Sequence, residues 1–497
     1  MKNSIILFLI LISNAVHAQE VTTPLREFRA AWIATVGNID WPSKKGLSSD
    51  IQQQEFIQII DQIKQNGLNA VIVQIRPAAD ALYNSPYENW SRYLSGTQGT
   101  PPYPYYDPLT FMVEECHKRC IEFHAWFNPF RALVDVTKNP NTSDHVTYTH
   151  PDWFLNYGDK KYFDPGLPEV REYFMKIVMD VVKRYDIDAV HFDDYFYPYR
   201  IAKQEFPDYR SYARYGLNFS SKDDWRRDNV NKLIEALSKK IKAEKPYVKF
   251  GISPFGVWRN SNKDPEGSFT TAGQTNYDDL FADVLLWQKK GWIDYILPQL
   301  YWENGHRAAD YAELIRWWSA HSFNRHLYIG HGLYQVGVSK KVCWRNMNEI
   351  ETQIQQVRST KNVQGSAYYS ANAFKKNLCN LNFTFQSDLN PKPALLPLMS
   401  WIDNTAPESP VLKLSRSTSN GNELTWTIEN KSKEPLQFAV YKFLKNEQID
   451  LSQSKNLCTI IREQKFSCEP QHGTRYKYVV CALDRLHNQS LPSNSVE

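Results

Sequence analysis

The chain has 497 residues, a net charge of +4, 42% hydrophobic residues and 23% charged residues. The length allows two or three domains, and the composition is ordinary for a globular protein. The charge is mild and no long run of Lys or Arg occurs, so we expect no nucleic-acid partner.

The first residues, 1–18, have the pattern of a secretory signal peptide. Lys2 precedes an apolar run over residues 5–12, and Ala15 and Ala18 place small residues at a cleavage site. The run is too short to span a bilayer, and no later segment is long and apolar enough to do so. We therefore expect an exported protein, periplasmic or secreted, without a transmembrane segment.

Strand-like apolar runs alternate with amphipathic stretches through residues 19–403. The predicted strands are 28–36, 70–75, 122–127, 189–192, 249–253, 295–299, 327–330 and 366–369. The predicted helices are 53–66, 110–119, 169–185, 225–244, 277–290, 308–321 and 346–359. This alternation predicts an α/β protein with a (β/α)8 TIM barrel. A doubly wound open sheet is the alternative, disfavoured because no Gly-rich nucleotide loop follows the first strand.

Long loops follow four of the predicted strands, at 78–107, 128–168, 195–224 and 254–276. They are rich in Tyr, Trp, Pro and Asn, whereas the connections from helix to strand are short. Elaboration at the carboxyl ends of the strands is how a barrel builds an extended binding cleft.

Residues 404–497 differ in character. A Pro-rich linker at 405–410 precedes short segments that alternate with a period of two, among them 476–484. The strand Trp426 and the alternation of Tyr, Val, Ala and Asp in the last strand resemble a fibronectin type III domain. This resemblance implies a small all-β sandwich and says little about function. We expect the domain to be a spacer or a glycan-contact module.

Two adjacent acids, Asp193 and Asp194, follow the apolar strand at 189–192. Strand side chains alternate, so His191 and Asp193 point one way, while Asp194 begins the turn. Glycosidic cleavage requires an acid for the leaving oxygen and a second group for the oxocarbenium-like centre. Close carboxylates repel each other's charge and raise one pKa, which favours catalysis by this pair. The alternative is that Asp194 only caps the following loop.

Two further acids lie at predicted strand ends. Glu303 follows the sixth strand and is either the second catalytic carboxylate or an exposed loop residue. Asp80 follows the second strand and either binds a sugar hydroxyl or forms an ion pair with Arg76.

Polar and aromatic side chains at the strand ends are candidates for substrate binding. Sugars require converging polar groups, and Arg can bind a carboxylate with two hydrogen bonds. Aromatic residues make up 14% of the chain, and their faces stack on sugar rings. We expect His191 also to orient Asp193. The polar candidates are Arg76, Asp80, Asn128, Arg131, His191 and Gln299, and the stacking candidates are Trp32, Trp126, Trp258, Tyr301 and Trp302.

Six segments of the barrel resemble, in order, the bacterial glycosyl hydrolase-like family 10. They are 29–36, 74–83, 124–131, 191–198, 253–259 and 298–302. The resemblance implies a glycoside hydrolase, and members of the family include enzymes that cleave peptidoglycan glycan strands lacking stem peptides. It carries over no catalytic assignment.

The expected reaction is hydrolysis of a cell-wall polysaccharide by carboxylate acid/base catalysis. If the sugar carries an N-acetyl group, that group can instead act as the nucleophile. The alternatives are hydrolysis of another polysaccharide and a carbohydrate-binding barrel without activity, which is disfavoured because both acids are present. No His, Cys and acid cluster has metal-ligand spacing and no phosphate loop occurs, so we expect no cofactor and no obligatory metal.

Overall fold

The computed structural model describes residues 23–137, 142–418, 421–430, 434–468 and 475–497. The predicted signal peptide, residues 1–18, lies outside the described residues. No helix within these ranges is long and apolar enough to cross a membrane.

Nine parallel strands within the described ranges form a closed barrel. The hydrogen-bonded order is β10-β11-β12-β1-β2-β3-β7-β8-β9, and pairing of β9 with β11 closes the sheet. Two short strands, β9 and β10, share the sixth of the eight barrel positions, so the predicted (β/α)8 barrel is confirmed. The bounds are β1 Phe28–Ile33, β2 Ala70–Arg76, β3 Glu122–Phe127, β7 Ala189–Phe192, β8 Lys249–Ile252, β9 Tyr295–Ile296, β10 Gln299–Leu300, β11 His326–His331 and β12 Val363–Tyr368.

Amphipathic helices surround the barrel. In α5, for example, the buried residues Val170, Phe174, Ile177, Val178 and Val181 recur at helical spacing, so one face packs inward. The main helices are α1 Ser49–Gln65, α3 Pro108–Lys118, α5 Pro168–Arg184, α7 Lys222–Glu244, α8 Val284–Lys289, α9 Tyr311–Ala320, α10 Asn348–Ser359 and α11 Ala371–Lys376.

The helix predicted over 277–290 is wrong in its first half. Asp279 accepts hydrogen bonds from the backbone nitrogen and the hydroxyl of Thr275, at 2.6 and 3.0 Å, which fixes a turn there. Asp283 then caps α8 by accepting a bond from Leu286 N at 3.2 Å, so the helix begins only at Val284.

The loops at the carboxyl ends of the strands carry extra elements. An antiparallel sheet in the order β4-β6-β5 lies between β3 and α5. The bounds are β4 Arg131–Leu133, β5 Phe154–Tyr157, β6 Lys160–Phe163, α2 Arg92–Ser95, α4 Val146–Thr149 and α6 Tyr209–Tyr215, with α12 Leu381–Thr384 after the last barrel strand.

The described part of residues 404–497 forms two three-stranded sheets, β13-β14-β17 and β16-β15-β18. Leu424 and Trp426 of the first sheet pack against Phe438 and Val480 of the second, so the two sheets enclose a core of their own. The bounds are β13 Val411–Thr418, β14 Gly421–Thr427, β15 Gln437–Leu444, β16 Leu457–Ile461, β17 Lys465–Cys468 and β18 Tyr476–Leu483.

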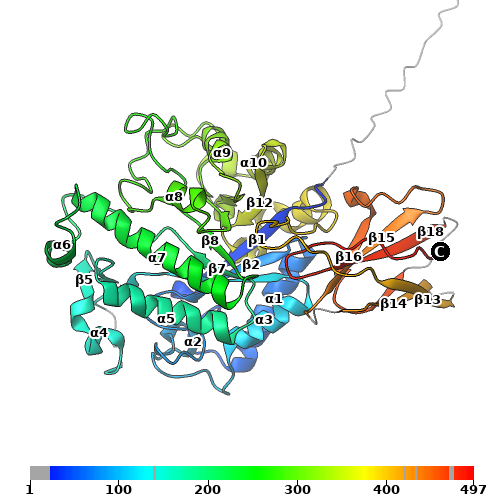
Figure 1. The fold of residues 1–497 in the computed structure, drawn as a ribbon, viewed down its shortest axis with the longest axis horizontal. Coiled ribbons are helices and arrows are strands. Elements are labelled where there is room, and N and C mark those ends of the chain that lie inside the picture. Colours follow the sequence, from blue (N-terminus) through cyan, green and yellow to red (C-terminus); the bar gives the residue numbers. More distant parts are fainter. Residues whose placement is uncertain (1–22, 138–141, 419–420, 431–433, 469–474) are drawn as a thin grey trace, which may run out of the picture.

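This all-β domain lies against the barrel (Figure 1). Tyr441 and Leu457, on the sheet β16-β15-β18, share an apolar cluster with Leu395 of the barrel. The Arg485 guanidinium forms an ion pair with Asp186, which lies just before β7. His487 Nε2 lies 3.6 Å from the Glu122 carboxylate, at the first residue of β3. These contacts are at the amino-terminal ends of the strands, opposite the edge at which Asp193 and Asp194 lie.

A protein that ends at residue 403 should lose stability but keep its chemistry. Removal of the domain exposes the apolar surface around Leu395, so we expect the Tm to fall by about 5 °C or more. Turnover of a short soluble substrate below the new Tm should stay within a few-fold of the full chain. Thermal unfolding and a rate assay at low temperature check both expectations. An unchanged Tm would show that the interface contributes nothing to stability.

Candidate active site

The acid pair lies where β7 ends, in the mouth of the barrel. Asp193 and Asp194 are 5% and 2% exposed. Both oxygens of each carboxyl group accept a hydrogen bond. Asp193 accepts from Asn128 Nδ2 and, at 3.2 Å, from the backbone nitrogen of Tyr195. Asp194 accepts from the Tyr199 hydroxyl and, at 3.1 Å, from Gln299 Nε2.

A chain of hydrogen bonds across three neighbouring strands fixes the amide that contacts Asp193. Gln74 Oε1 accepts from the backbone nitrogens of Thr35 and Val36, at 3.1 and 3.0 Å. This leaves Gln74 Nε2 to donate to Asn128 Oδ1 at 2.5 Å. The Asn128 amide can then present only its nitrogen to Asp193, so β1, β2 and β3 together place one neutral donor on this carboxyl group.

The two acids differ in their electrostatic surroundings. Burial, followed by the charge of Asp194, raises the pKa of Asp193 to about 7. Burial also raises the pKa of Asp194, but the donors Tyr199 and Gln299 oppose that shift. Burial and the mutual repulsion of the two charges therefore favour a single proton on the pair, and the weaker compensation at Asp193 favours that residue as its site. One carboxylic acid beside one carboxylate is the arrangement that glycosidic cleavage requires.

Arg131 supplies a positive charge beside the pair. Its guanidinium lies 4.3 Å from the centre of the Tyr195 ring, and its Nη1 donates to Pro77 O at 3.5 Å. Its charge lowers the pKa of both aspartates, opposing burial. No carboxylate among the described residues forms an ion pair with it, so Arg131 can bind an anionic or carbonyl oxygen of a ligand.

Gln299 and Tyr301 form the side of the site contributed by the sixth barrel position. Gln299 Nε2 donates to Ser253 O at 3.0 Å as well as to Asp194, which fixes its orientation. Tyr301 is close enough to both aspartates and to Tyr369 for their charges to raise its pKa, although burial is the larger cause. The rings of Tyr301 and Tyr369 lie 5.9 Å apart and form an aromatic wall beside the acids.

Arg76 has a structural role, and the predicted ion pair with Asp80 is wrong. Its guanidinium binds Glu88 with two hydrogen bonds of 2.7 and 2.6 Å, and both side chains are fully buried. Arg76 also donates to Asn128 O. It therefore supports the backbone that carries Asn128 and has no free edge for a sugar.

Glu303 does not join the acid pair. Its carboxylate accepts hydrogen bonds from Lys341 Nζ at 2.7 and 2.9 Å and from Trp344 Nε1 at 3.4 Å. The Lys341 ammonium outweighs partial burial and lowers the pKa of Glu303. A general acid needs a raised pKa, so these surroundings do not suit Glu303 for that role.

His191 does not orient Asp193, contrary to expectation. Its Nδ1 lies 2.9 Å from the Tyr295 hydroxyl, inside the barrel, and its Nε2 has no partner among the described residues. Burial lowers the pKa of His191 well below its usual value, so the ring is neutral. Trp32 packs edge-on against it at 6.3 Å and is 2% exposed, so both residues belong to the barrel core beneath the acids.

The remaining aromatic candidates divide between core and site. Trp258 is buried and stacks on Trp317 of α9 at 5.7 Å. Trp302 is partly exposed and packs against Phe255 at 5.4 Å, and Phe255 in turn lies 6.1 Å from Tyr199. Phe255 therefore separates Trp302 from Tyr199, the residue that bonds Asp194. Trp126, like Trp32, is buried in the interior of the barrel.

The prediction missed Gln74, Tyr199 and Tyr369. Tyr199 lies only five residues after Asp194, in the aromatic loop, and its position beside the acid was a usable signal. Gln74 and Tyr369 act across strands, through contacts that no local spacing reveals.

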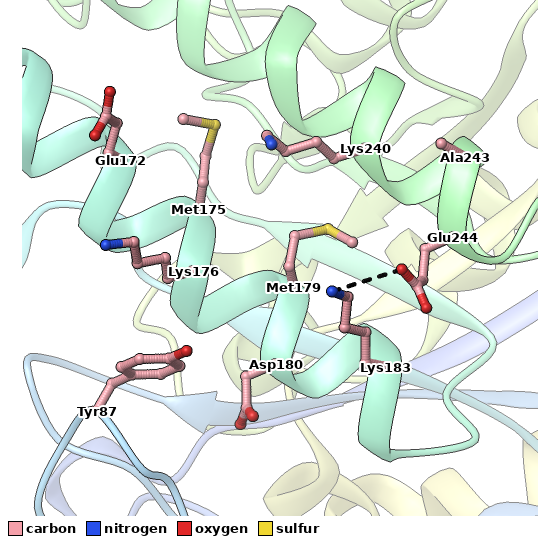
Figure 2. Close-up of a pocket in the computed structure, with 10 residues that line it drawn as sticks. All are labelled: Tyr87, Glu172, Met175, Lys176, Met179, Asp180, Lys183, Lys240, Ala243 and Glu244. Carbon is pink, nitrogen blue, oxygen red and sulfur yellow. Dashed lines mark ion pairs between the residues drawn. The ribbon is translucent and has the colours of Figure 1, made fainter.

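One cavity lies away from the acids, on the outer surface between α5 and α7 (Figure 2). It has a volume of about 660 Å³ and contains Met175, Met179 and the ion pair between Lys183 and Glu244. Its three lysines are matched by three acids, so its charge favours no particular ligand. No group of three or more His, Cys, Asp or Glu side chains within the described ranges could hold a metal ion.

Comparison with known proteins identifies the family of this chain. The sequence model of the family described as "Glycosyl hydrolase-like 10" matches residues 27–346. "Glycosyl hydrolase YngK" of Bacillus subtilis is 48% identical over 94% of this chain and 92% of its own length. "Glycosyl hydrolase DigH" of Escherichia coli K12 is 40% identical over 65% of this chain and 76% of its own length. Among solved structures, the PgaB (BpsB) glycoside hydrolase domain from Bordetella bronchiseptica covers 73% of this chain and 98% of its own, with 13% identity and a TM-score of 0.47. The predicted glycoside hydrolase class is confirmed by the family and its named relatives. The chain belongs to the glycosyl hydrolase-like 10 family.

Proposed function

We propose that this glycoside hydrolase is exported and cleaves bacterial cell-wall glycan, namely peptidoglycan strands that lack stem peptides. The observation that carries the proposal is the buried Asp193–Asp194 pair, whose pKa values burial raises, beside an Arg131 without an ion-pair partner among the described residues. Glycan without stem peptides presents free carboxylates, which a guanidinium can bind. Export rests on the signal-peptide pattern of residues 1–18.

In the proposed mechanism, Asp193 protonates the leaving oxygen. Asp194 stays ionised because Tyr199 and Gln299 donate to it, and it holds the N–H of the substrate's acetamido group. The acetamido oxygen then attacks the anomeric carbon as the bond to the leaving oxygen breaks, and water later opens the ring that forms. Two carboxyl groups on consecutive residues suit this division, since both act on the same sugar.

The C-terminal domain is proposed to be of the fibronectin type III type and to act as a spacer. Its two packed sheets and the strand Trp426 support this assignment. Its contacts lie at the end of the barrel opposite the acids, so we assign it no part in the chemistry.

Substitution of either aspartate should abolish most activity on glycan strands. Asp193→Asn and Asp194→Asn should each lower kcat/KM by about 100-fold or more, the range that a positioned acid or base contributes. Release of reducing ends from purified glycan strands without stem peptides, compared with other polysaccharides, measures the effect. Glu303→Gln is the matched control and should stay within a few-fold of the wild type.

Full activity in both aspartate variants would contradict the site. Preferential hydrolysis of another polysaccharide would contradict the substrate. A covalent glycosyl-enzyme trapped on a side chain and seen by mass spectrometry would contradict the role of the acetamido group.

The rate should depend on pH through the shared proton. Asp193 must be protonated, so kcat/KM should fall as the pH rises through about 7. On the acid side the rate should fall as Asp194 takes up a proton. A pH profile of kcat/KM checks this, and an alkaline limit near the usual Asp pKa of about 4 would exclude Asp193 as the acid.

Two variants should move the alkaline limit in opposite directions. The charge of Asp194 raises the pKa of Asp193, so the residual activity of Asp194→Asn should lose its alkaline limb at a lower pH than the wild type. The Asn128 donor lowers that pKa, so Asn128→Leu should move the limb to a higher pH. If the alkaline limbs of the two variants moved in the same direction, the assignment of the proton to Asp193 would be contradicted.

A further inference from the structure

A second polar cavity opens among the loops that follow β1, β2 and β3, the same end of the barrel as the acid pair. Its volume is about 260 Å³. Its walls combine two cations, two carboxylates, an amide and a phenol with apolar side chains from β4 and its flanks. The residues used below are Lys45, Asp80, Arg92, Tyr93, Gln98 and Ala132.

Asp80 in the wall of this cavity has an unused hydrogen-bond acceptor. The side chain is 5% exposed, and the Ser91 hydroxyl bonds its carboxyl group. Its Oδ1 has no partner among the described residues. Burial raises the pKa of Asp80 to about 6, so the group is still ionised at neutral pH. A buried carboxylate oxygen without a donor is costly, and a ligand hydroxyl would remove that cost.

The cavity lies close to Arg131, whose charge acts on the acid pair. Tyr93 lines the cavity and lies close enough to Asp80, Arg92 and Arg131 for their charges to act on its pKa. Arg131 immediately precedes Ala132 in β4, and Ala132 lines the cavity. The Arg131 guanidinium is the cation that acts on Asp193 and Asp194. The cavity therefore lies near the residue whose charge acts on both aspartates.

We propose that this cavity is a second carbohydrate subsite, which binds a further sugar residue of the same glycan chain. Asp80 accepts a hydrogen bond from a sugar hydroxyl, while Lys45 and Arg92 donate to sugar oxygens. The mixture of polar and apolar walls is typical of sugar sites, and the volume is just below the 300–1,000 Å³ or so of pockets for larger ligands. The proposal rests on the proposed function, since it requires a polymeric substrate.

The test compares substrates of different length. For the wild type and Asp80→Asn, kcat/KM is measured on a glycan of about eight sugars and on one of two. The ratio of kcat/KM on the long glycan to kcat/KM on the short glycan should fall about 10-fold to 100-fold in Asp80→Asn, because only the long chain reaches the cavity. Asp164→Asn is the matched control: Asp164 is also buried, its pKa is also raised to about 6, and it lies outside this cavity. Its ratio should equal that of the wild type.

Equal losses on both substrates, or an unaltered ratio, would overturn the subsite. Lys45→Gln provides a second, exposed position if Asp80→Asn fails to fold, and its ratio should also fall. The ratio is measured on whichever glycan the wild type hydrolyses. If the proposed cell-wall substrate is wrong, the wild type alone shows it by not hydrolysing that glycan. If the proposed subsite is wrong, only the variants show it, because their ratios equal that of the wild type.

Discussion

Two adjacent carboxyl groups buried at the end of one strand cannot both be charged without strong compensation. In this barrel the compensation is unequal. Asp194 receives a phenol and an amide from Tyr199 and Gln299, whereas Asp193 receives one amide and one backbone nitrogen. Burial and the neighbouring charge raise the pKa of Asp193 to about 7, which favours a proton on that residue. The separation of acid from carboxylate follows from which donors each one meets, although the two residues are chemically identical.

The surroundings of the pair are built by the whole first half of the barrel. Backbone nitrogens after β1 orient Gln74 on β2, and Gln74 orients Asn128 after β3. Arg76, fixed by Glu88, supports the same Asn128 from its backbone side. The C-terminal domain binds the opposite end, through Arg485 and Asp186, and leaves the mouth of the barrel to the loops. Stability and chemistry are thus placed at the two ends of the strands, as is typical of this fold.

The sequence was sufficient to predict the barrel because its periodic segments are long and each long loop follows a strand. It also located Asp193 and Asp194, since a strand that ends in two acids is a local pattern. It was insufficient for Glu303 and Arg76, because their partners Lys341 and Glu88 lie 38 and 12 residues away and only folding brings them together. The prediction that His191 orients Asp193 was wrong for a different reason. Strand alternation predicts the face on which the His191 side chain lies but not how deep in the barrel it lies, and its partner Tyr295 comes from another strand.

The central claim is that Asp193 carries the proton of the pair, and a direct titration of that carboxyl group tests it. Infrared difference spectra of the wild type minus Asp193→Asn, recorded across pH, isolate its carbonyl stretch. The account predicts a protonated carboxyl band that persists at pH 6 and has lost about half of its intensity near pH 7. A band that is lost near pH 4, with the proton retained instead on Asp194, would contradict it.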